Sequence, residues 1–251
     1  MTRRFLPALA LAAGLAAAPA FAFDVGAMTD AERAAFREEV RAYLLENPEI
    51  IMEAVAVLER RQAAEQVAND AALVSTNHDA IFNDGYSYIG GNPEGDVTFV
   101  EFVDYKCGYC RKAFPELAQL IEQDGNIRII YKEFPILGEE SLLASRFAVS
   151  AKLIAGDDAY GRLHDAMMTM RGTMTTASLS GLAGDLGLDG EAIVAGMSDP
   201  QVDAIIGMNH ELAGRLQISG TPTFVMRDQL LRGYVPLDGM VQIVAELRAA
   251  Q

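Results

Sequence analysis

The sequence predicts an α/β fold in which a block of helices interrupts the α/β domain, preceded by a separate helical region. Three observations lead to this expectation. A strand, a helix and a second strand follow one another between residues 97 and 132. Residues 139–217 then show only helical periodicity before two short strands and a closing helix. Residues 29–77 are helical throughout, with no strand pattern among them.

Composition and charge exclude several classes of protein. Of the 251 residues, 51% are hydrophobic and 22% are charged, which is the composition of a globular protein rather than a disordered one. The formal net charge is −15, and no run of Lys and Arg is longer than a pair. Nucleic acid is therefore not an expected partner, because proteins that bind it present a basic surface.

The first 22 residues have the pattern of a secretory signal peptide. Arg3 and Arg4 precede an apolar stretch at 5–18, and Ala20-Phe21-Ala22 has the small-x-small pattern of a cleavage site. The stretch is too short to span a bilayer as a helix, so an uncleaved anchor is the weaker alternative. We expect the mature chain to be located in the periplasm, a compartment that permits disulfides.

Residues 23–77 are expected to form an N-terminal oligomerisation region and a linker helix. Thr29 and Glu32 make a capping box, and Asn47-Pro48 starts a second helix. Residues 59–77 are largely polar and predict a connecting helix exposed on most sides. A region of this length cannot build a core of its own. Its apolar stripes must therefore pack on the main domain or on other subunits. The stripes comprise Phe36, Val40, Tyr43, Leu44, Ile51, Ala54, Val55 and Leu58.

Residues 78–251 contain the predicted catalytic domain. The strands at 97–103 and 127–132 flank a helix from residue 107 to about 123, which makes a βαβ unit with a parallel strand pair. The helical block at about 139–217 follows. Strands at 223–226 and 230–234 and a helix at about 238–249 complete the domain. Gly90-Gly91-Asn92-Pro93 predicts a loop.

The only two cysteines, Cys107 and Cys110, are separated by two residues and open the helix of this βαβ unit. At the helix N-terminus, free N–H groups and the macrodipole stabilise an anion, so Cys107 is expected to be the reactive thiolate and Cys110 the shielded resolving thiol. A structural disulfide is the alternative, but so short a loop gains only about 2 kcal/mol from closure. A zinc site needs four ligands, and His78, His164 and His210 are scattered.

Three motifs in order resemble those of the DsbA-like thioredoxin-fold oxidoreductases. They are FVEFVDYKCGYC at 99–110, YKEFPILG at 131–138 and SGTPTFV at 219–225. The resemblance covers about residues 90–251 and implies a thioredoxin fold with an inserted helical domain. The helices ahead of it resemble those of the suppressor-of-copper-sensitivity protein C (ScsC) subgroup, which implies N-terminal oligomerisation helices and a homotrimer.

The resemblance also implies roles for residues outside the cysteine pair. Pro222 would be a cis-proline facing the cysteines, and the backbone of Thr221 would pair with an incoming polypeptide. Glu101 matches a buried acid that exchanges a proton with Cys110. Without the family, Pro222 would be interpreted as an ordinary trans-proline that starts a strand. Glu101 would be interpreted as an acid near a strand end.

The residues between the cysteines bear on the direction of the reaction. Gly108-Tyr109 lacks the Pro-His pair that strong oxidases of the family carry, and Cys-Gly-Tyr-Cys with Thr before the cis-proline is the combination of periplasmic disulfide isomerases. The sequence therefore favours a disulfide isomerase with no cofactor besides the Cys107/Cys110 pair. Two alternatives stay open: a DsbA-type dithiol oxidase, and a copper-tolerance protein that binds Cu(I) with the same cysteines. Expected partners are exported proteins with cysteines and a membrane redox partner that resets the pair.

Overall fold

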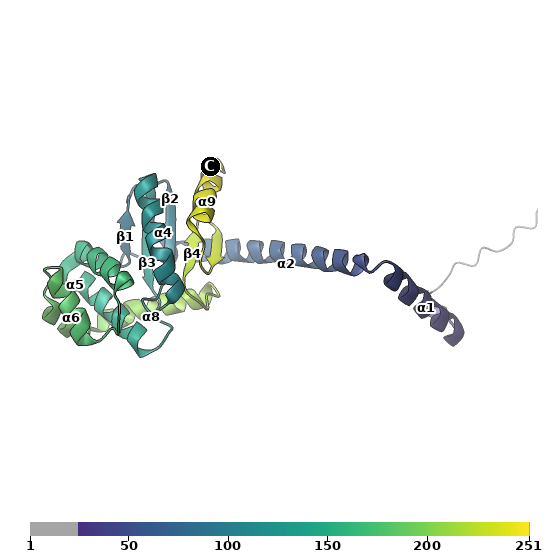
Figure 1. Cartoon of the computed structure of the whole chain (residues 1–251), viewed down its shortest axis with the longest axis horizontal. Helices are drawn as coiled ribbons and strands as arrows, with labels where there is room; N and C mark the ends of the chain where they lie inside the picture. Colours follow the sequence, from purple (N-terminus) through teal and green to yellow (C-terminus); the bar gives the residue numbers. More distant parts are fainter. Residues whose placement is uncertain (1–24, 251) are drawn as a thin grey trace, which may run out of the picture. The chain divides into compact units, whose positions relative to one another are not determined.

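The computed structural model of the chain describes residues 25–250, so the predicted signal peptide lies outside the described residues. The chain divides into two compact units, one up to Arg60 and one from Arg61 onward. The elements of both units are labelled in Figure 1.

The first unit is helical. After a short 3-10 helix (Val25–Ala27), helix α1 (Asp30–Glu46) begins at Thr29, where the predicted capping box with Glu32 is formed. Helix α2 (Glu49–Thr76) starts directly after Pro48, as the Asn-Pro signal predicts. No residue of α1 is buried. In the described part of this unit, none of the side chains of the predicted apolar stripe is buried.

The second unit is built on a five-stranded sheet in the order β1-β3-β2-β4-β5. Its strands are β1 (Tyr88–Gly91), β2 (Val97–Val103), β3 (Ile127–Glu133), β4 (Thr223–Met226) and β5 (Gln229–Arg232). Strands β2 and β3 are parallel, and helix α4 (Gly108–Asp124) connects them as a βαβ unit. The other neighbouring pairs are antiparallel. The active-site strand β2 thus lies at the centre of the sheet, buried on both faces.

Helices cover both faces of this sheet. Phe99, Ile129 and Leu117 belong to the core shared with α4 and α9 (Leu237–Ala249). Val100 and Leu216 belong to the core on the opposite face, which α3 (His78–Phe82) and α8 (Pro200–Arg215) help to cover. The inserted block, predicted at 139–217, consists of α5 (Glu139–Thr169), α6 (Thr176–Asp185), α7 (Gly190–Gly196) and α8. Figure 1 shows α5 and α6 side by side, and α5 contacts β1.

The loop predicted at Gly90-Gly91-Asn92-Pro93 is wrong for Gly90 and Gly91, which form the end of strand β1. The strand pairs antiparallel with β3 at the sheet edge, where Gly90 lies opposite Ile129. A side chain at Gly91 would meet the carbonyl oxygen of Ile127 at 2.4 Å, and the residue has a φ of +65°. Glycine is thus required by the close approach of the two strands, and the glycine pair hides the strand from a pattern search.

The end of α2 also differs from the exposed linker expected at 59–77. Asp70 and Val74 are buried, and Val74 joins the core on the α3/α8 face. Both oxygens of Asp70 accept hydrogen bonds from the guanidinium of Arg232 on β5, at 2.7 and 2.9 Å. The last turns of α2 therefore belong to the sheet-containing unit, which begins at Arg61 rather than at residue 78.

Candidate functional site

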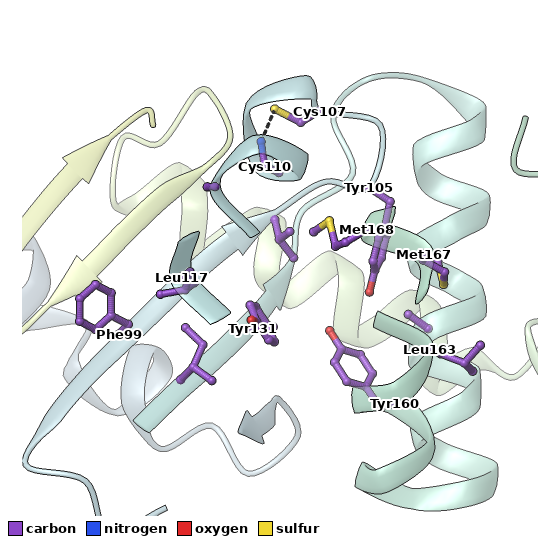
Figure 2. Close-up of a cluster of buried hydrophobic side chains, with 14 of the residues drawn as sticks. Phe99, Tyr105, Cys107, Cys110, Leu117, Tyr131, Tyr160, Leu163, Met167 and Met168 are labelled. Carbon is purple, nitrogen blue, oxygen red and sulfur yellow. Dashed lines mark hydrogen bonds between the residues drawn. The ribbon is translucent and has the colours of Figure 1, made fainter. Parts of the chain in front are cut away.

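The two cysteines lie at the N-terminus of α4. Cys107 is the N-cap residue, and its Sγ accepts a hydrogen bond from the backbone N–H of Cys110 at 3.5 Å (Figure 2). Both side chains are free thiols. Cys107 is 7% exposed and Cys110 is fully buried. An incoming sulfur atom can therefore reach Cys107 but not Cys110.

This placement separates the acidities of the two thiols. The Cys110 thiol donates to Cys107, and together with the amides of Cys110 and Tyr109 it lowers the pKa of Cys107 to about 5. Burial raises the pKa of Cys110 far above its ordinary value. At neutral pH the pair consists of a thiolate at Cys107 and a neutral thiol at Cys110, as expected for a nucleophile and a resolving group.

The loop before β4 brings Thr221 and Pro222 to the cysteines. The Thr221–Pro222 peptide bond is cis. The carbonyl oxygen of Thr221 lies 3.1 Å from the Sγ of Cys107, although the two residues are 114 positions apart in the chain. The backbone of Thr221 and the reactive sulfur thus form one surface, where an extended peptide can lie with its own sulfur against Cys107.

Glu101 lies beneath the pair on β2. Its side chain is 3% exposed and shares a sheet face with Phe99 and Val103, the face that α4 covers. Burial, and to a smaller extent the negative charges of Cys107 and Glu133, raise its pKa to about 8. A carboxyl group with this pKa changes protonation state near neutral pH, which suits a group that gives and accepts protons.

Asp104 organises the segment between β2 and α4, a role that we did not predict from the sequence. Its carboxylate accepts backbone hydrogen bonds from Lys106, Ile136 and Leu137 at 2.8 to 3.1 Å. The carbonyl of Asp104 also accepts from the N–H of Cys107 at 3.0 Å. An acid between a strand end and a helix start is a signal for such a turn. The loop at Ile136 and Leu137, which the Asp104 carboxylate also binds, lies far away in the sequence and was therefore not predicted.

The rim of the site carries an aromatic pair. Tyr109, between the cysteines, is 63% exposed, and its ring lies 6.4 Å from that of Tyr234. The ammonium of Lys112 lies 4.1 Å from the centre of the Tyr234 ring. Tyr109 therefore offers an apolar ring to a substrate chain and places no positive charge beside Cys107.

The site offers few ligands to a metal ion. Within residues 25–250, no group of three or more His, Cys, Asp or Glu side chains is arranged to hold one. Met167 and Met168 are buried in the core rather than turned toward solvent (Figure 2). A soft ion at this site would depend on the two sulfur atoms of Cys107 and Cys110.

Residues 98–245 match the family model of the DSBA-like thioredoxin domain. The chain belongs to this family. Residues 32–65 match the model of the copper resistance protein ScsC N-terminal domain. The DsbA-like thioredoxin fold and the relationship to ScsC that the motifs indicated are thereby confirmed.

Solved structures agree with this assignment. A thioredoxin-like oxidoreductase from Silicibacter pomeroyi is 40% identical, with a TM-score of 0.65 over 70% of this chain and 99% of its own. A linker-deletion mutant of Proteus mirabilis ScsC is 28% identical, with a TM-score of 0.67 over 91% of this chain and 100% of its own. A periplasmic thioredoxin-like protein from Salmonella enterica serovar Typhimurium is 29% identical, with a TM-score of 0.61 over 68% and 95%.

Curated relatives include membrane transporters that match over part of their length. The Na(+)/H(+) antiporter NhaA 1 of Salinispora arenicola is 28% identical over 154 residues, and NhaA of Herminiimonas arsenicoxydans is 27% identical over 147. The chain spans 23% of the length of each. Among the helices that the structure describes here, none is long and apolar enough to cross a bilayer.

Proposed function

We propose that the protein is a periplasmic disulfide isomerase that reshuffles wrong disulfides in exported proteins. The observation that carries this proposal is the Cys107 sulfur: it is a thiolate at neutral pH, it is accessible at its edge, and it lies against the Thr221 backbone. The predicted signal peptide and the printed name of the periplasmic Salmonella relative support the compartment.

The reaction begins with attack of the Cys107 thiolate on one sulfur of a substrate disulfide. The substrate S–S bond breaks, a mixed disulfide forms, and the other substrate sulfur leaves as a thiolate. A different substrate thiolate then attacks the mixed disulfide, which forms a new substrate disulfide and regenerates the Cys107 thiolate. No electrons are gained or lost overall, so the enzyme must start reduced.

Cys110 resolves the mixed disulfide when no substrate thiolate does so. Once Cys107 has lost its thiolate charge, Glu101 releases its proton to solvent. The proton of Cys110 then passes to the Glu101 carboxylate, and the Cys110 thiolate attacks the Sγ of Cys107. A Cys107–Cys110 disulfide forms, and the substrate leaves as a thiol after it takes up a proton from water. A membrane redox partner must then supply two electrons, and one proton restores the Cys110 thiol while Cys107 returns as the thiolate. Bond formation to Cys107 also removes the thiolate charge that disfavours ionisation of Glu101.

The isomerase role is further supported by the N-terminal unit. Apolar side chains along α1 and the start of α2 are exposed, including Tyr43 at 56%, Ile51 at 52% and Leu58 at 55%. Burial of each releases roughly 1.5–3 kcal/mol, so association of these helices between copies is strongly favoured. A homotrimer, as the ScsC resemblance implies, would present several Cys107 sites to one misfolded substrate.

Refolding of ribonuclease with scrambled disulfides tests the isomerase proposal against a DsbA-type oxidase. The reduced protein should restore ribonuclease activity catalytically. An oxidase would instead work best as the disulfide form on fully reduced ribonuclease and would fail to rescue the scrambled protein. A Cys107→Ser variant, which keeps the fold but lacks the nucleophile, is the control.

Cu(I) binding is the second candidate function. It is favoured by two adjacent free thiols and by the copper resistance named in the N-terminal family model. Competition with a chromogenic Cu(I) chelator measures it, with Cys107→Ser and Cys110→Ser as controls. A pure copper carrier would bind Cu(I) tightly and would leave scrambled ribonuclease inactive.

A further inference from the structure

A second buried carboxyl group, Glu133, lies close to the active site and takes no part in the exchange steps above. It is the last residue of β3 and stands next to Val103 of β2 in the sheet register. Because side chains alternate along a strand, Glu133 shares its sheet face with Tyr131, the residue opposite Glu101. Glu133 is 3% exposed. Two acids are thus buried on one face of the sheet, on adjacent strands.

Three hydroxyl groups hold the Glu133 carboxylate. The hydroxyls of Tyr105 and Tyr160 donate to its Oε1 at 2.9 and 2.5 Å, and that of Ser145 donates to its Oε2 at 2.6 Å. Figure 2 shows the hydroxyl ends of Tyr105 and Tyr160 turned toward each other. Both oxygens are therefore bound as acceptors, which is the arrangement that stabilises the charged form of a buried acid.

The donors come from separate parts of the fold. Tyr105 belongs to the segment two residues before Cys107, whereas Ser145 and Tyr160 belong to α5 of the helical insertion. Glu101 contrasts with Glu133, because no hydrogen bond to its carboxyl group is found in the part of the chain that the structure describes. Glu133 thus has hydroxyl donors that stabilise its charged form, whereas Glu101 has none.

No cation cancels the charge of Glu133. Within residues 25–250, its carboxylate forms no ion pair, and Lys152 at the edge of the adjoining cavity pairs instead with Asp157. His164, whose Nδ1 lies 3.1 Å from the Tyr105 hydroxyl, is neutral because burial lowers its pKa to about 3. The titratable and charged groups that surround Glu133 are Glu101, Asp104, Tyr105, Tyr131, Tyr160, His164, Lys152, Tyr86 and Tyr88.

We propose that Glu133 is a positioning residue whose buried carboxylate, held by the hydroxyls of Tyr105, Tyr160 and Ser145, supplies a negative charge that, together with burial, keeps Glu101 protonated in the dithiol state. The proposal deepens the proposed function and rests on it for the role of Glu101 toward Cys110. With Glu133 charged, Glu101 keeps its proton while Cys107 is a thiolate. It becomes a base only after Cys107 has entered a mixed disulfide.

Acidity supports this order. Burial raises the pKa of Glu133 to about 7, against an opposing effect of its three hydroxyl donors. The pKa of Glu101, which lacks such donors, is raised to about 8 by burial and by the charges of Cys107 and Glu133. Because hydroxyl donors stabilise the carboxylate of Glu133 and not that of Glu101, we expect the proton to leave Glu133 first as the pH rises.

Carbon-13 NMR titration of the glutamate side chains in the reduced, full mature protein tests the proposal. Glu101→Gln identifies the Glu101 signal by its loss. Glu133→Gln, which keeps the shape but removes the charge, should lower the midpoint of Glu101 by about one pH unit. Glu133→Asp keeps the charge and should hold the midpoint near the wild-type value. An unchanged Glu101 midpoint in the folded Glu133→Gln protein would overturn the proposal.

Two serines on α5 provide a second test that does not require substitution of Glu133. Ser145 donates to Glu133, whereas Ser141, one turn earlier and equally buried, has no hydrogen-bond partner. Ser145→Ala should raise the Glu133 midpoint by at least about half a unit, because the carboxylate loses a donor, and Ser141→Ala should leave it unchanged. Equal midpoints in the two variants would contradict the proposed network.

These titrations do not depend on isomerase activity, so the two proposals can fail separately. If Glu133→Gln shifts the Glu101 midpoint while Glu101→Gln leaves the rate of mixed-disulfide resolution unchanged, the charge relationship stands and the proton transfer from Cys110 is refuted. If Glu101→Gln slows resolution and Glu133→Gln shifts nothing, the proposed function stands without Glu133.

Discussion

At the scale of single residues, the chemistry depends on two sulfur atoms with opposite environments. Cys107 sits where the first amides of α4 are free to bind an anion, and Cys110 sits one turn further inside the core. The same helical turn therefore makes one thiol acidic and the other inert. Glu101 beneath them is the nearby acid whose protonation can follow the charge on Cys107.

The positions of the two cysteines predict which of them attacks a substrate. Cys110→Ser should accumulate mixed disulfides with substrate proteins, because Cys107 can attack but nothing resolves the product. Cys107→Ser should accumulate none, because Cys110 is buried. Non-reducing gel electrophoresis after acid quenching counts the trapped species. Equal trapping by both variants would refute the assignment.

The low pKa of Cys107 predicts a pH-dependent difference in stability between the redox forms. Its pKa falls from an ordinary 9.0 in the unfolded chain to about 5 in the folded one. The resulting stabilisation of the reduced form is fully present above the unfolded value and is lost as the pH falls through the folded value. Denaturant unfolding of both forms should show the reduced form gaining on the oxidised form from pH 5 to 9. A constant difference over that window would contradict the assigned thiolate.

The thiolate also predicts the reduction potential. Stabilisation of reduced Cys107 makes the disulfide more oxidising than that of thioredoxin, whereas Gly108-Tyr109 provides no extra positive charge, so the potential should stay below that of a DsbA-type oxidase. Equilibration with glutathione measures it. A value at or below about −270 mV, that of thioredoxin, would contradict the expectation.

At the scale of elements, helix α2 is shared between the two units: its beginning belongs to the N-terminal unit and its end to the catalytic unit. The last turns of α2 bury Val74 and tie Asp70 to Arg232 on β5. Gln66, one turn earlier, also donates to Asp70 at 2.8 Å. Through the Asp70–Arg232 ion pair, the last turns of α2 contact β5, the strand at the edge of the sheet.

This contact predicts a stability loss that depends on one carboxylate. Asp70→Asn should lower the free energy of unfolding of the catalytic unit by about 1–3 kcal/mol, because a charged, bidentate hydrogen bond becomes a neutral one. The pKa of Asp70 is lowered by Arg232, so the wild-type advantage should fade at acidic pH as the carboxylate takes up a proton.

Glu65→Gln provides the control for that experiment. Glu65 lies on the same helix but is exposed, so its substitution should change the unfolding free energy little. Denaturant unfolding followed by circular dichroism measures all three proteins. If the two variants lose the same stability, the Asp70–Arg232 pair has no special part in anchoring α2.

At the scale of the whole molecule, the arrangement of two units separates association from chemistry. The N-terminal unit exposes apolar side chains and holds none of the reacting groups, whereas the unit from Arg61 onward contains all of them. Loss of association should therefore leave simple thiol chemistry intact and should remove only what needs several active sites on one substrate.

The oligomer prediction can be tested without removing any segment. Replacement of Val40 and Val55 by Glu in the full mature chain should yield a monomer, because charged groups cannot be buried unpaired. The monomer should keep its thiol reductase activity and lose most of its isomerase activity. Glu39→Gln, an exposed change on the same helix, is the control. Light scattering decides the point: a monomeric mass for the wild type at micromolar concentration would refute the oligomer.

A shortened chain gives an independent test of the same prediction. A chain that begins at Arg61 keeps Asp70 and Val74 on the sheet-containing unit and should be a stable monomer. A chain that begins at Asn77 lacks both contacts and should unfold at a lower denaturant concentration. Equal stability would show that the end of α2 contributes nothing to the catalytic unit.

Features that depend on neighbouring residues could be predicted from local patterns in the chain. Apolar runs and helical periodicity predicted β2, β3, α4 and the helical insertion, and the spacing of Cys107 and Cys110 at a helix start predicted the acidic thiol. Motif resemblance supplied the family. Each of these follows from residues close together in the chain, where periodicity and capping act directly on the backbone.

Features made by residues far apart in the chain could not be predicted in this way and are seen in the three-dimensional fold. Strand β1 pairs with β3, which approaches Gly91 closely. The end of α2 is held by the ion pair between Asp70 and Arg232. The Glu133 cluster gathers Tyr105, Ser145 and Tyr160 from two separate segments. Burial and the charges of spatial neighbours set the pKa of each buried acid, and no local pattern records which distant side chains those neighbours will be.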